Sequence, residues 1–492
     1  MNFSRILVLS LAFSLVCFLP RAAHTQQMPE EMIEEASSDL EPQLQGSPEE
    51  MLEEAPTIAA PPPQKLPKAP APAREAVEIQ VQKKEAHPAA ALPVSAKVIP
   101  PDVMTAEWEF FKANSEDKDD DVAEAVLPQL SQWLKTYPEG KYSDEAILLK
   151  AELQLRLGDY RSAVVTLIRH TQEYPDSKLG DAARQQLGIT IDKKLSKKIK
   201  DPLNALARAP QAGDKAGRLA AFIGGMADEF GEEFYAPVLS EFDGFFVRFP
   251  AYTGRDALQL SLGNLYARKG EYLPARLAYE KLIQVYPSSK YLVRAKKELG
   301  DVLADNLKEY LTAIKVYSDI TVNFPGTDEA WAAYLQLPKL TEKQDQYGRA
   351  VAVYEEIIKL YPDKPEARDA FRSEARVLRK EMKNPAGAVA VLNRFADKYK
   401  DEEAIEELYL AAEIARKDMR DIDTEVKMYD RIAAEYPDSK EAPKALMEAG
   451  RAFEKVKNPD SAIKYYEKIM DRYPDDSMAK KAYKYKTALT RS

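Results

Sequence analysis

The stretch that decides the fold is residues 262–287, which read LGNLYARKGEYLPARLAYEKLIQVYP. Apolar residues recur at helical spacing on both sides of a central Gly-Glu-Tyr, which predicts two helices joined by a short turn. Gly263 in the first helix and Ala275 in the second are small enough for the helices to approach closely, and Tyr279 fills the remaining groove. Pro287 ends the second helix, because proline disfavours helical geometry at the residue before it. The stretch therefore predicts an antiparallel helix pair.

An aromatic residue followed by proline closes this helix pair, and the same dipeptide recurs along the chain. The intervals between successive copies are 37 or 38 residues, or 75 residues where one copy is missing. Tyr399-Lys400 fills one long interval, because the aromatic residue is kept while the proline is lost. In the other, only Pro210 lies near the expected place. The copies are Tyr137-Pro138, Tyr174-Pro175, Phe249-Pro250, Tyr286-Pro287, Phe324-Pro325, Tyr361-Pro362, Tyr436-Pro437 and Tyr473-Pro474.

A turn after the first helix keeps the same phase. The turns are Gly158-Asp159-Tyr160, Gly270-Glu271-Tyr272, Lys308-Glu309-Tyr310, Asp345-Gln346-Tyr347, Lys383-Asn384-Pro385 and Lys457-Asn458-Pro459. Each is followed by a small residue of the second helix: Ala163, Ala275, Ala313, Ala350, Ala388 and Ala462. Two signals that share one phase over so many periods predict an array of helix pairs, in which each repeat packs on its neighbours.

This pattern resembles the tetratricopeptide repeat, whose signature is Leu-Gly and Tyr in the first helix, Ala and an aromatic residue in the second, and a closing Pro. The corresponding residues here are Leu262-Gly263, Tyr266, Ala275, Tyr279 and Pro287, while Gln259 stands in place of the family's early Trp. The resemblance implies an all-α, TPR-like α-solenoid, a right-handed superhelix of about ten helix pairs. It also implies a concave wall, lined mainly by the first helices, that holds extended or helical segments of other proteins.

The composition divides the chain into a tail and this array. Residues 27–104 are first acidic and then rich in Pro and Ala, and without apolar periodicity they predict a disordered tether. From about 189 to 235 the phase fades and glycines appear, which predicts a degenerate repeat or a hinge. We therefore expect these segments: 1–26, a signal peptide or N-terminal anchor; 27–104, the linker; 105–188, N-terminal TPR-like repeats; 189–235, the degenerate repeat or hinge; 236–475, C-terminal TPR-like repeats; and 476–492, a capping helix.

The N-terminal segment carries an apolar run from Ile6 to Leu19. Fourteen apolar-rich residues suit a secretory signal and are too few for an ordinary membrane span. No clear cleavage site follows, so an uncleaved anchor that associates the chain with a membrane is the alternative. Val16 is too large to precede a lipidated cysteine at Cys17, so we do not expect lipoprotein anchoring. We expect export to the periplasm or to the periplasmic face of the cell envelope.

A short acidic phrase occurs twice in the linker, at residues 29–36 and 48–55. One interpretation is a solvated tether with a duplicated segment. The other is a pair of docking motifs, each a nascent helix that presents two apolar residues to a partner. Those apolar residues are Met32, Ile33, Met51 and Leu52.

The sequence carries no pattern for catalysis or for a cofactor. The net charge of −10 leaves no basic face, so we do not expect nucleic acid as a partner. Cys17 is the only cysteine, and His170 is the only histidine after residue 104, where its place on the helix indicates packing. Phosphate-loop, dinucleotide, zinc-protease and calcium-loop patterns do not occur. We therefore expect no enzyme activity, no catalytic or metal-ligating residues, no cofactor and no small-molecule substrate.

Function is then expected on the surface of the first helices. Several outward positions there are cationic and suit a carboxylate or an acidic segment of a partner, with ordinary solvated surface charge as the alternative. The candidate partner-binding residues are Arg156, Asn264, Arg268, Arg294, Lys297, Arg451 and Lys455.

The long period and the Tyr-Pro-Asp-Ser linkers resemble a narrower group of exported repeat proteins. This group is similar to the BamD-like lipoprotein of outer-membrane β-barrel assembly and to the periplasmic coordinator of the Tol-Pal system. The resemblance implies a non-catalytic scaffold of the bacterial cell envelope that binds envelope proteins, in outer-membrane or envelope assembly. A scaffold of a secretion or motility machine is the alternative within this class. A cell-wall (peptidoglycan) enzyme or glycan-binding accessory is the alternative of another class, and it requires convergent carboxylates in a cleft.

Overall fold

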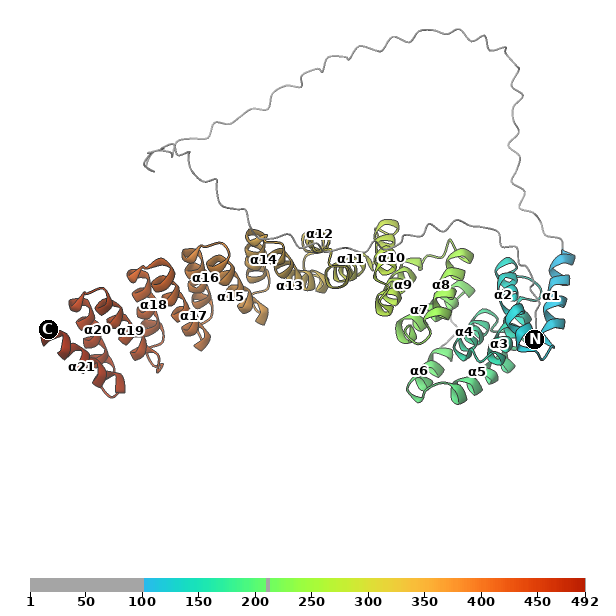
Figure 1. Cartoon of the computed structure of the whole chain (residues 1–492), viewed down its shortest axis with the longest axis horizontal. Coiled ribbons are helices and arrows are strands. Elements are labelled where there is room, and N and C mark those ends of the chain that lie inside the picture. The colour runs from blue at the N-terminus through green and yellow to red at the C-terminus, as the bar shows by residue number, and fades with distance from the viewer. Residues whose placement is uncertain (1–100, 209–212, 492) are drawn as a thin grey trace, which may run out of the picture. The chain divides into compact units, whose positions relative to one another are not determined.

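The computed structural model describes residues 101–208 and 213–491, and the regular structure in these ranges is entirely helical. The expected signal segment and the motif residues Met32, Ile33, Met51 and Leu52 lie outside the described residues. The elements in Figure 1 are α1 (Pro101–Ser115), α2 (Asp120–Thr136), α3 (Ser143–Arg156), α4 (Tyr160–Glu173), α5 (Gly180–Lys194), α6 (Lys197–Ala207), α7 (Lys215–Phe230), α8 (Tyr235–Arg248), α9 (Arg255–Lys269), α10 (Tyr272–Val285), α11 (Leu292–Asp301), η1 (Val302–Asn306), α12 (Tyr310–Asn323), α13 (Asp328–Lys343), α14 (Tyr347–Leu360), α15 (Pro365–Lys380), α16 (Pro385–Lys398), α17 (Glu402–Ile414), η2 (Ala415–Met419), α18 (Ile422–Glu435), α19 (Ala442–Lys455), α20 (Pro459–Arg472) and α21 (Ser477–Arg491).

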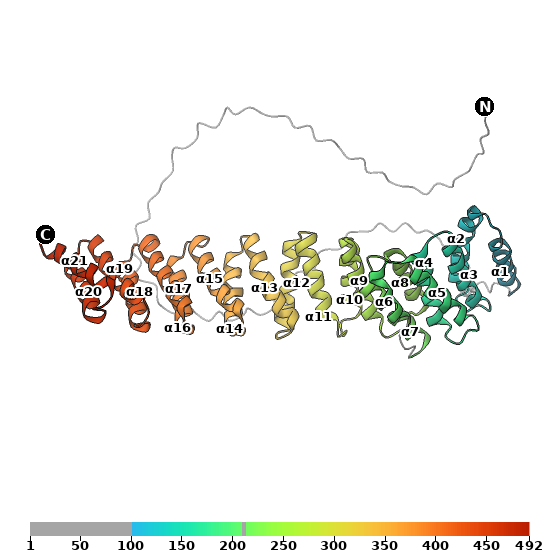
Figure 2. The same ribbon diagram turned by 90° about the horizontal axis from the view of Figure 1, so that it is seen from below.

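Consecutive helices pack against each other in pairs, and the pairs follow one another in chain order (Figures 1 and 2). Within the described ranges, α1 to α20 form ten pairs and α21 follows them, which confirms the all-α array of stacked pairs that the sequence period predicted. The buried apolar side chains gather in clusters drawn from neighbouring helices. Each repeat is therefore stabilised mainly by its neighbours. No helix in this part of the chain has the length and apolar character needed to cross a membrane.

The close approach within a pair depends on a glycine opposite a tyrosine, as predicted from residues 262–287. A β-carbon on Gly450 would lie only 2.5 Å from Cε1 of Tyr466, and Gly263 faces Tyr279 in the same way. Both tyrosines are fully buried. The Tyr466 hydroxyl also donates a hydrogen bond to Oε1 of Glu454 at 2.7 Å, which fixes the ring over the glycine. The glycine and the tyrosine therefore form one packing unit.

The turns of the predicted phase share a backbone conformation. In each, one residue adopts a left-handed conformation: Gly158, Gly270, Lys308, Asp345, Lys383, Arg420 and Lys457, with φ between 52° and 83°. A side chain strains this conformation, and glycine occupies it at only two of these positions. The sequence pattern did not include Arg420, because the following Asp421-Ile422 lacks the Tyr or Pro of the other turns. The turn at Arg420 could have been predicted only from its place in the repeat period, 37 residues after Lys383.

Two first helices end in a π-helical turn that takes up an extra residue. The turn residue Lys308 lies eight positions after Gly300, whereas Gly270 lies seven positions after Gly263. In η1 the amide of Leu307 donates to the carbonyl five residues earlier, so the additional residue bulges out of the helical ladder. The segment η2 does the same before the turn at Arg420. The repeats thus keep their packing despite unequal lengths.

The order of packing changes where the sequence period fades. α4 packs on α7 and α8 as well as on α5, and α7 packs on α9. α8 therefore lies against α4 although the α5–α6 pair separates them in the sequence. This arrangement produces two cavities, one along α7, α9 and α11 and one among α2, α3, α4 and α8.

Candidate protein-binding groove

Three first helices, α7, α9 and α11, line a groove with a volume of about 820 Å³. α7 contributes small residues to it: Gly217, Ala220, Ala221, Gly224 and Gly225. Positions 217, 221 and 224 are spaced by three or four residues, so they share one face of the helix. Glycine weakens α7 as a helix, but Gly224 leaves room beside its backbone, while Gly225 packs closely against Leu206.

Polar groups on α7 and α9 are held in fixed positions. Oδ2 of Asp256 accepts a hydrogen bond from Ser289 at 2.6 Å, and Oδ2 of Asp228 accepts one from Ser261 at 3.3 Å. Tyr252 also lines the groove. Burial and nearby carboxylates raise the pKa of Tyr252, so its hydroxyl stays protonated and can donate a hydrogen bond. The groove therefore offers both hydrogen-bond donors and acceptors.

The cations of the groove differ in what they contact. Arg268 donates to the main-chain carbonyl of Asp228 at 2.6 Å, near the C-terminal end of α7. The ammonium of Lys290 lies over the ring of Tyr291, 5.0 Å from its centroid. Arg294 is exposed and forms no hydrogen bond or ion pair with any residue that the structure describes. Arg294 is thus the groove cation whose charge is most accessible to a partner.

Of the seven predicted partner-binding residues, Asn264, Arg268 and Arg294 line this groove together. Asn264 already accepts a hydrogen bond from the Tyr279 hydroxyl at 2.8 Å. Because Arg268 is bound to the carbonyl at the end of α7, it positions that helix. Arg294 alone among these three has no such contact within the described ranges.

The other four predicted residues lie outside the groove. Lys455 is exposed at the end of α19. The other three form ion pairs within the chain: Arg156 with Asp120 at 3.0 Å, Lys297 with Asp301 at 2.6 Å, and Arg451 with Glu448 at 2.9 Å. Arg156 also donates to the carbonyl of Asp117 at 2.5 Å, which ties α3 to the loop between α1 and α2. These three cations therefore have a structural role in the array.

Sequence reasoning missed the residues of α7 and further groove residues beyond it, among them Tyr252, Asp256 and Lys290. The helical spacing of small residues from 217 to 225 was visible in the sequence. This spacing indicated a helix face without large side chains. The contact between α7 and α9 depends on the changed packing order, and nothing in the sequence near α7 predicted it.

His170 is fully buried in α4, and its Nε2 lies 2.6 Å from Oδ1 of Asp144. This position agrees with the packing interpretation of that histidine. Across residues 101–208 and 213–491, no three His, Cys, Asp or Glu side chains gather in a way that would hold a metal ion.

Several segments of the chain match the tetratricopeptide repeat family: residues 145–177, 256–289, 341–403, 408–439 and 444–476. These segments fall mainly on α3–α4, α9–α10, α14 to α16, α17–α18 and α19–α20. Stacked helix pairs with an open groove define a class of protein-interaction scaffolds. The chain therefore carries tetratricopeptide repeats in these segments, and such repeats generally bind protein partners and are typically non-catalytic.

Solved structures match the chain at low sequence identity. A tetratricopeptide repeat protein from Parabacteroides merdae is 14% identical with a TM-score of 0.30, and the match covers 56% of this chain and 100% of that chain. PilW, a type IV pilus biogenesis factor, is 15% identical with a TM-score of 0.26, covering 48% and 100%. The pilF protein of Pseudomonas aeruginosa is 18% identical with a TM-score of 0.24, covering 46% and 95%. These scores are too low to bear on the partners of this chain. No curated protein matches it by sequence.

Proposed function

We propose that this chain is an exported scaffold that binds a segment of a partner protein in the groove of α7, α9 and α11. The observation that carries the proposal is a helix face without side-chain bulk in the same groove as an unpaired cation, Arg294. The volume of about 820 Å³ lies within the range of roughly 300–1,000 Å³ that is usual for binding pockets. It therefore suits a short segment of a partner rather than a folded domain.

The groove indicates the chemistry of that segment. A main chain can approach α7 closely at Gly224, where a larger residue would hold it away. A carboxylate of the partner pairs with Arg294, since hydrogen bonds between ionised groups are the stronger ones. Asp228 and Asp256 accept hydrogen bonds from the partner's amides. We therefore expect an acidic segment, extended or helical, with small residues at the contact.

A groove-filling variant tests this proposal. Ala221 is exposed on α7 and lines the groove, so Ala221→Trp should occlude it without disturbing the core. Ala125 is exposed on α2, away from the groove, and Ala125→Trp is the matched control. We expect affinity purification from cells to recover a defined set of partners with the unchanged chain and with Ala125→Trp, and to lose them with Ala221→Trp. Recovery of the same partners with Ala221→Trp would overturn the proposed site.

We further propose that the partners are envelope proteins and that the scaffold acts in the periplasm, in outer-membrane or envelope assembly. The apolar run from Ile6 to Leu19 supports export, and the lack of any cysteine after Cys17 suits an oxidising compartment. A secretion or motility scaffold is the alternative, with the same binding mode and different partners.

Export is tested separately, with a C-terminal reporter enzyme that is active only outside the cytoplasm. We expect activity from the full chain and none after deletion of residues 1–26. Equal activity from both would contradict the assignment of the N-terminal segment and would leave the groove proposal untouched.

A further inference from the structure

A second cavity, with a volume of about 260 Å³, lies where α8 packs against α4. Side chains from four helices line it: Ser131, Leu134 and Lys135 of α2, Lys150 of α3, Arg169 of α4, and Ser240, Glu241, Asp243, Gly244, Val247 and Arg248 of α8. Four of these residues are cationic and two are anionic. The excess of cations among the lining residues is balanced by Glu173 and Glu139, which pair with the two arginines, so the two lysines are the cations left without a carboxylate contact.

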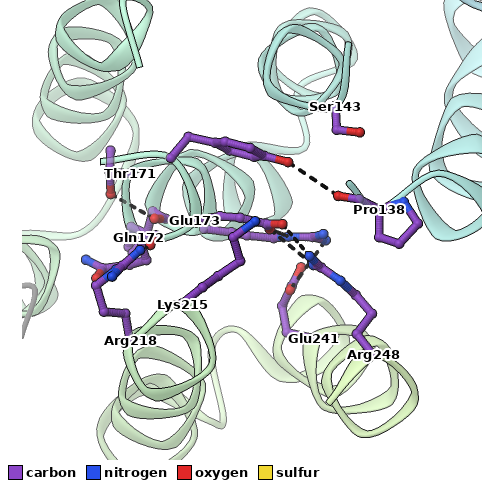
Figure 3. Close-up of polar contacts among 12 residues, drawn as sticks. Pro138, Ser143, Thr171, Gln172, Glu173, Lys215, Arg218, Glu241 and Arg248 are labelled. Carbon is purple, nitrogen blue, oxygen red and sulfur yellow. Dashed lines mark hydrogen bonds and ion pairs between the residues drawn. The ribbon is translucent and has the colours of Figure 1, made fainter. Parts of the chain in front are cut away.

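The two arginines are held by carboxylates, of which Glu173 is fully buried. Arg169 pairs with Glu173 at 3.0 Å, and Arg248 pairs with both Glu173 and Glu139, the latter at 3.1 Å. Glu241 lies 3.6 Å from Arg169. Figure 3 shows Arg248 and Glu241 of α8 reaching toward Glu173 of α4. Burial alone would raise the pKa of Glu173, but the two arginines hold it below its usual value. The cluster is thus ionised and rigid.

The two lysines are not held in this way. Neither Lys150 nor Lys135 forms a hydrogen bond or an ion pair with any residue in the described ranges. Lys135 is exposed and Lys150 is half-buried. Burial lowers the pKa of Lys150, and the charge of Glu241 opposes this only in part. Holding a partly desolvated ammonium without a partner costs free energy, which an anion in the cavity would recover.

We propose that this cavity binds a small anion through an oxyanion group, a phosphate or a carboxylate, between Lys150 and Lys135. Arg169 and Arg248 lie at the same wall, but their guanidinium groups are already paired with carboxylates, so the two lysines supply the charge for the ligand. The hydroxyl of Ser240 makes no hydrogen bond within the described residues and can donate one to the ligand. The volume of about 260 Å³ is below the roughly 300–1,000 Å³ of pockets for drug-sized molecules, which restricts the ligand to a small ion.

This site is separate from the groove and does not depend on it. The groove is lined by α7, α9 and α11, whereas the anion site is lined by α2, α3, α4 and α8. Because α8 contacts both α4 and α7, an anion here would strengthen the packing that also places α7. Ligand binding would therefore be visible as added stability of the full chain as well as in direct titration.

The test is calorimetric titration of the full-length chain with inorganic phosphate and, separately, with succinate, against sodium chloride at equal ionic strength. We expect saturable binding of one of the two, with a Kd of about 1 mM or tighter. The anion that binds identifies the class of ligand. Absence of saturable binding with both would overturn the proposal.

Two variants locate the binding. Lys150→Met keeps the length of the side chain and removes its charge, and we expect it to weaken binding by at least about tenfold. Lys480→Met, at an exposed lysine of α21, is the matched control and should bind like the unchanged chain. If Lys150→Met fails to fold, Lys135→Met replaces it, since Lys135 is exposed and its change cannot disturb the core. Unaltered affinity in a folded variant at the tested lysine would contradict the assignment.

Discussion

The close packing of Gly450 against Tyr466 predicts that adding a single β-carbon at position 450 destabilises the chain. In Gly450→Ala the added β-carbon would lie 2.5 Å from Cε1 of Tyr466 and 3.0 Å from its Cζ. The ring is fully buried, and its hydroxyl is fixed by Glu454, so it has little room to move. Overpacking of this kind typically costs about 1–3 kcal/mol, and alanine regains about 1 kcal/mol of helix propensity. Because the overlap is with a rigid ring, we expect a net loss of about 2 kcal/mol.

Gly188→Ala is the matched control, because a β-carbon at Gly188 meets no atom within 4 Å. The same substitution should there increase the free energy of unfolding by up to about 1 kcal/mol. Urea unfolding measures both, and hydrogen exchange in α19 and α20 shows whether the effect is local, as expected for a repeat array. In the background of Tyr466→Leu the cost of Gly450→Ala should shrink. A chain with Gly450→Ala that is as stable as one with Gly188→Ala would show that the Tyr466 ring does not resist the added methyl group.

Three further predictions concern stability. Burial raises the pKa of Glu374 from 4.5 to about 7 despite its ion pair with Arg394. The folded chain therefore favours the protonated carboxyl group, and the stability that this group contributes at low pH is lost as the pH rises through about 7. Above that pH, Glu374→Gln should be more stable than the unchanged chain by up to about 3 kcal/mol, and urea unfolding as a function of pH would show a flatter profile. Arg420→Gly should gain about 1 kcal/mol by relieving a left-handed backbone with φ of 56°, and an unchanged urea midpoint would count against this strain. Ala275→Trp should lower the free energy of unfolding by more than about 3 kcal/mol, because Ala275 is fully buried between helices. Ser162→Trp is the control and should be tolerated better. Equal thermal unfolding of the two variants would mean that the helix phase is misassigned.

The sequence was sufficient for those parts of the fold that depend on neighbouring residues. The small residue opposite Tyr279, the turn at Gly270 and the stop at Pro287 all act within one helix pair, and a repeated pattern multiplies their signal. Because each pair packs mainly on the next, repetition of this local pattern is enough to predict the stacked array.

The sequence was not sufficient for contacts between distant segments. The packing of α8 on α4, which creates the smaller cavity, joins residues that are about 75 positions apart, and nothing in the local pattern indicates it. The sequence also failed to predict the contacts of two cations that were expected to face a partner. Arg156 and Arg268 were predicted to point outward, but both donate to main-chain carbonyls of a neighbouring helix pair. An outward position on a helix predicts that a side chain is accessible to solvent. It does not predict which main-chain carbonyl of a neighbouring helix pair that side chain will contact.

We propose above that partners bind in the groove of α7, α9 and α11. The most direct measurement is site-specific photo-crosslinking in living cells, with the photoreactive side chain at Ala221 in the groove and, for comparison, at Ala125 on α2. We expect crosslinks to a defined set of envelope proteins from Ala221 that are absent from Ala125, and we expect Arg294→Glu to abolish them. The same crosslinks from both positions, or none from Ala221, would contradict the proposal.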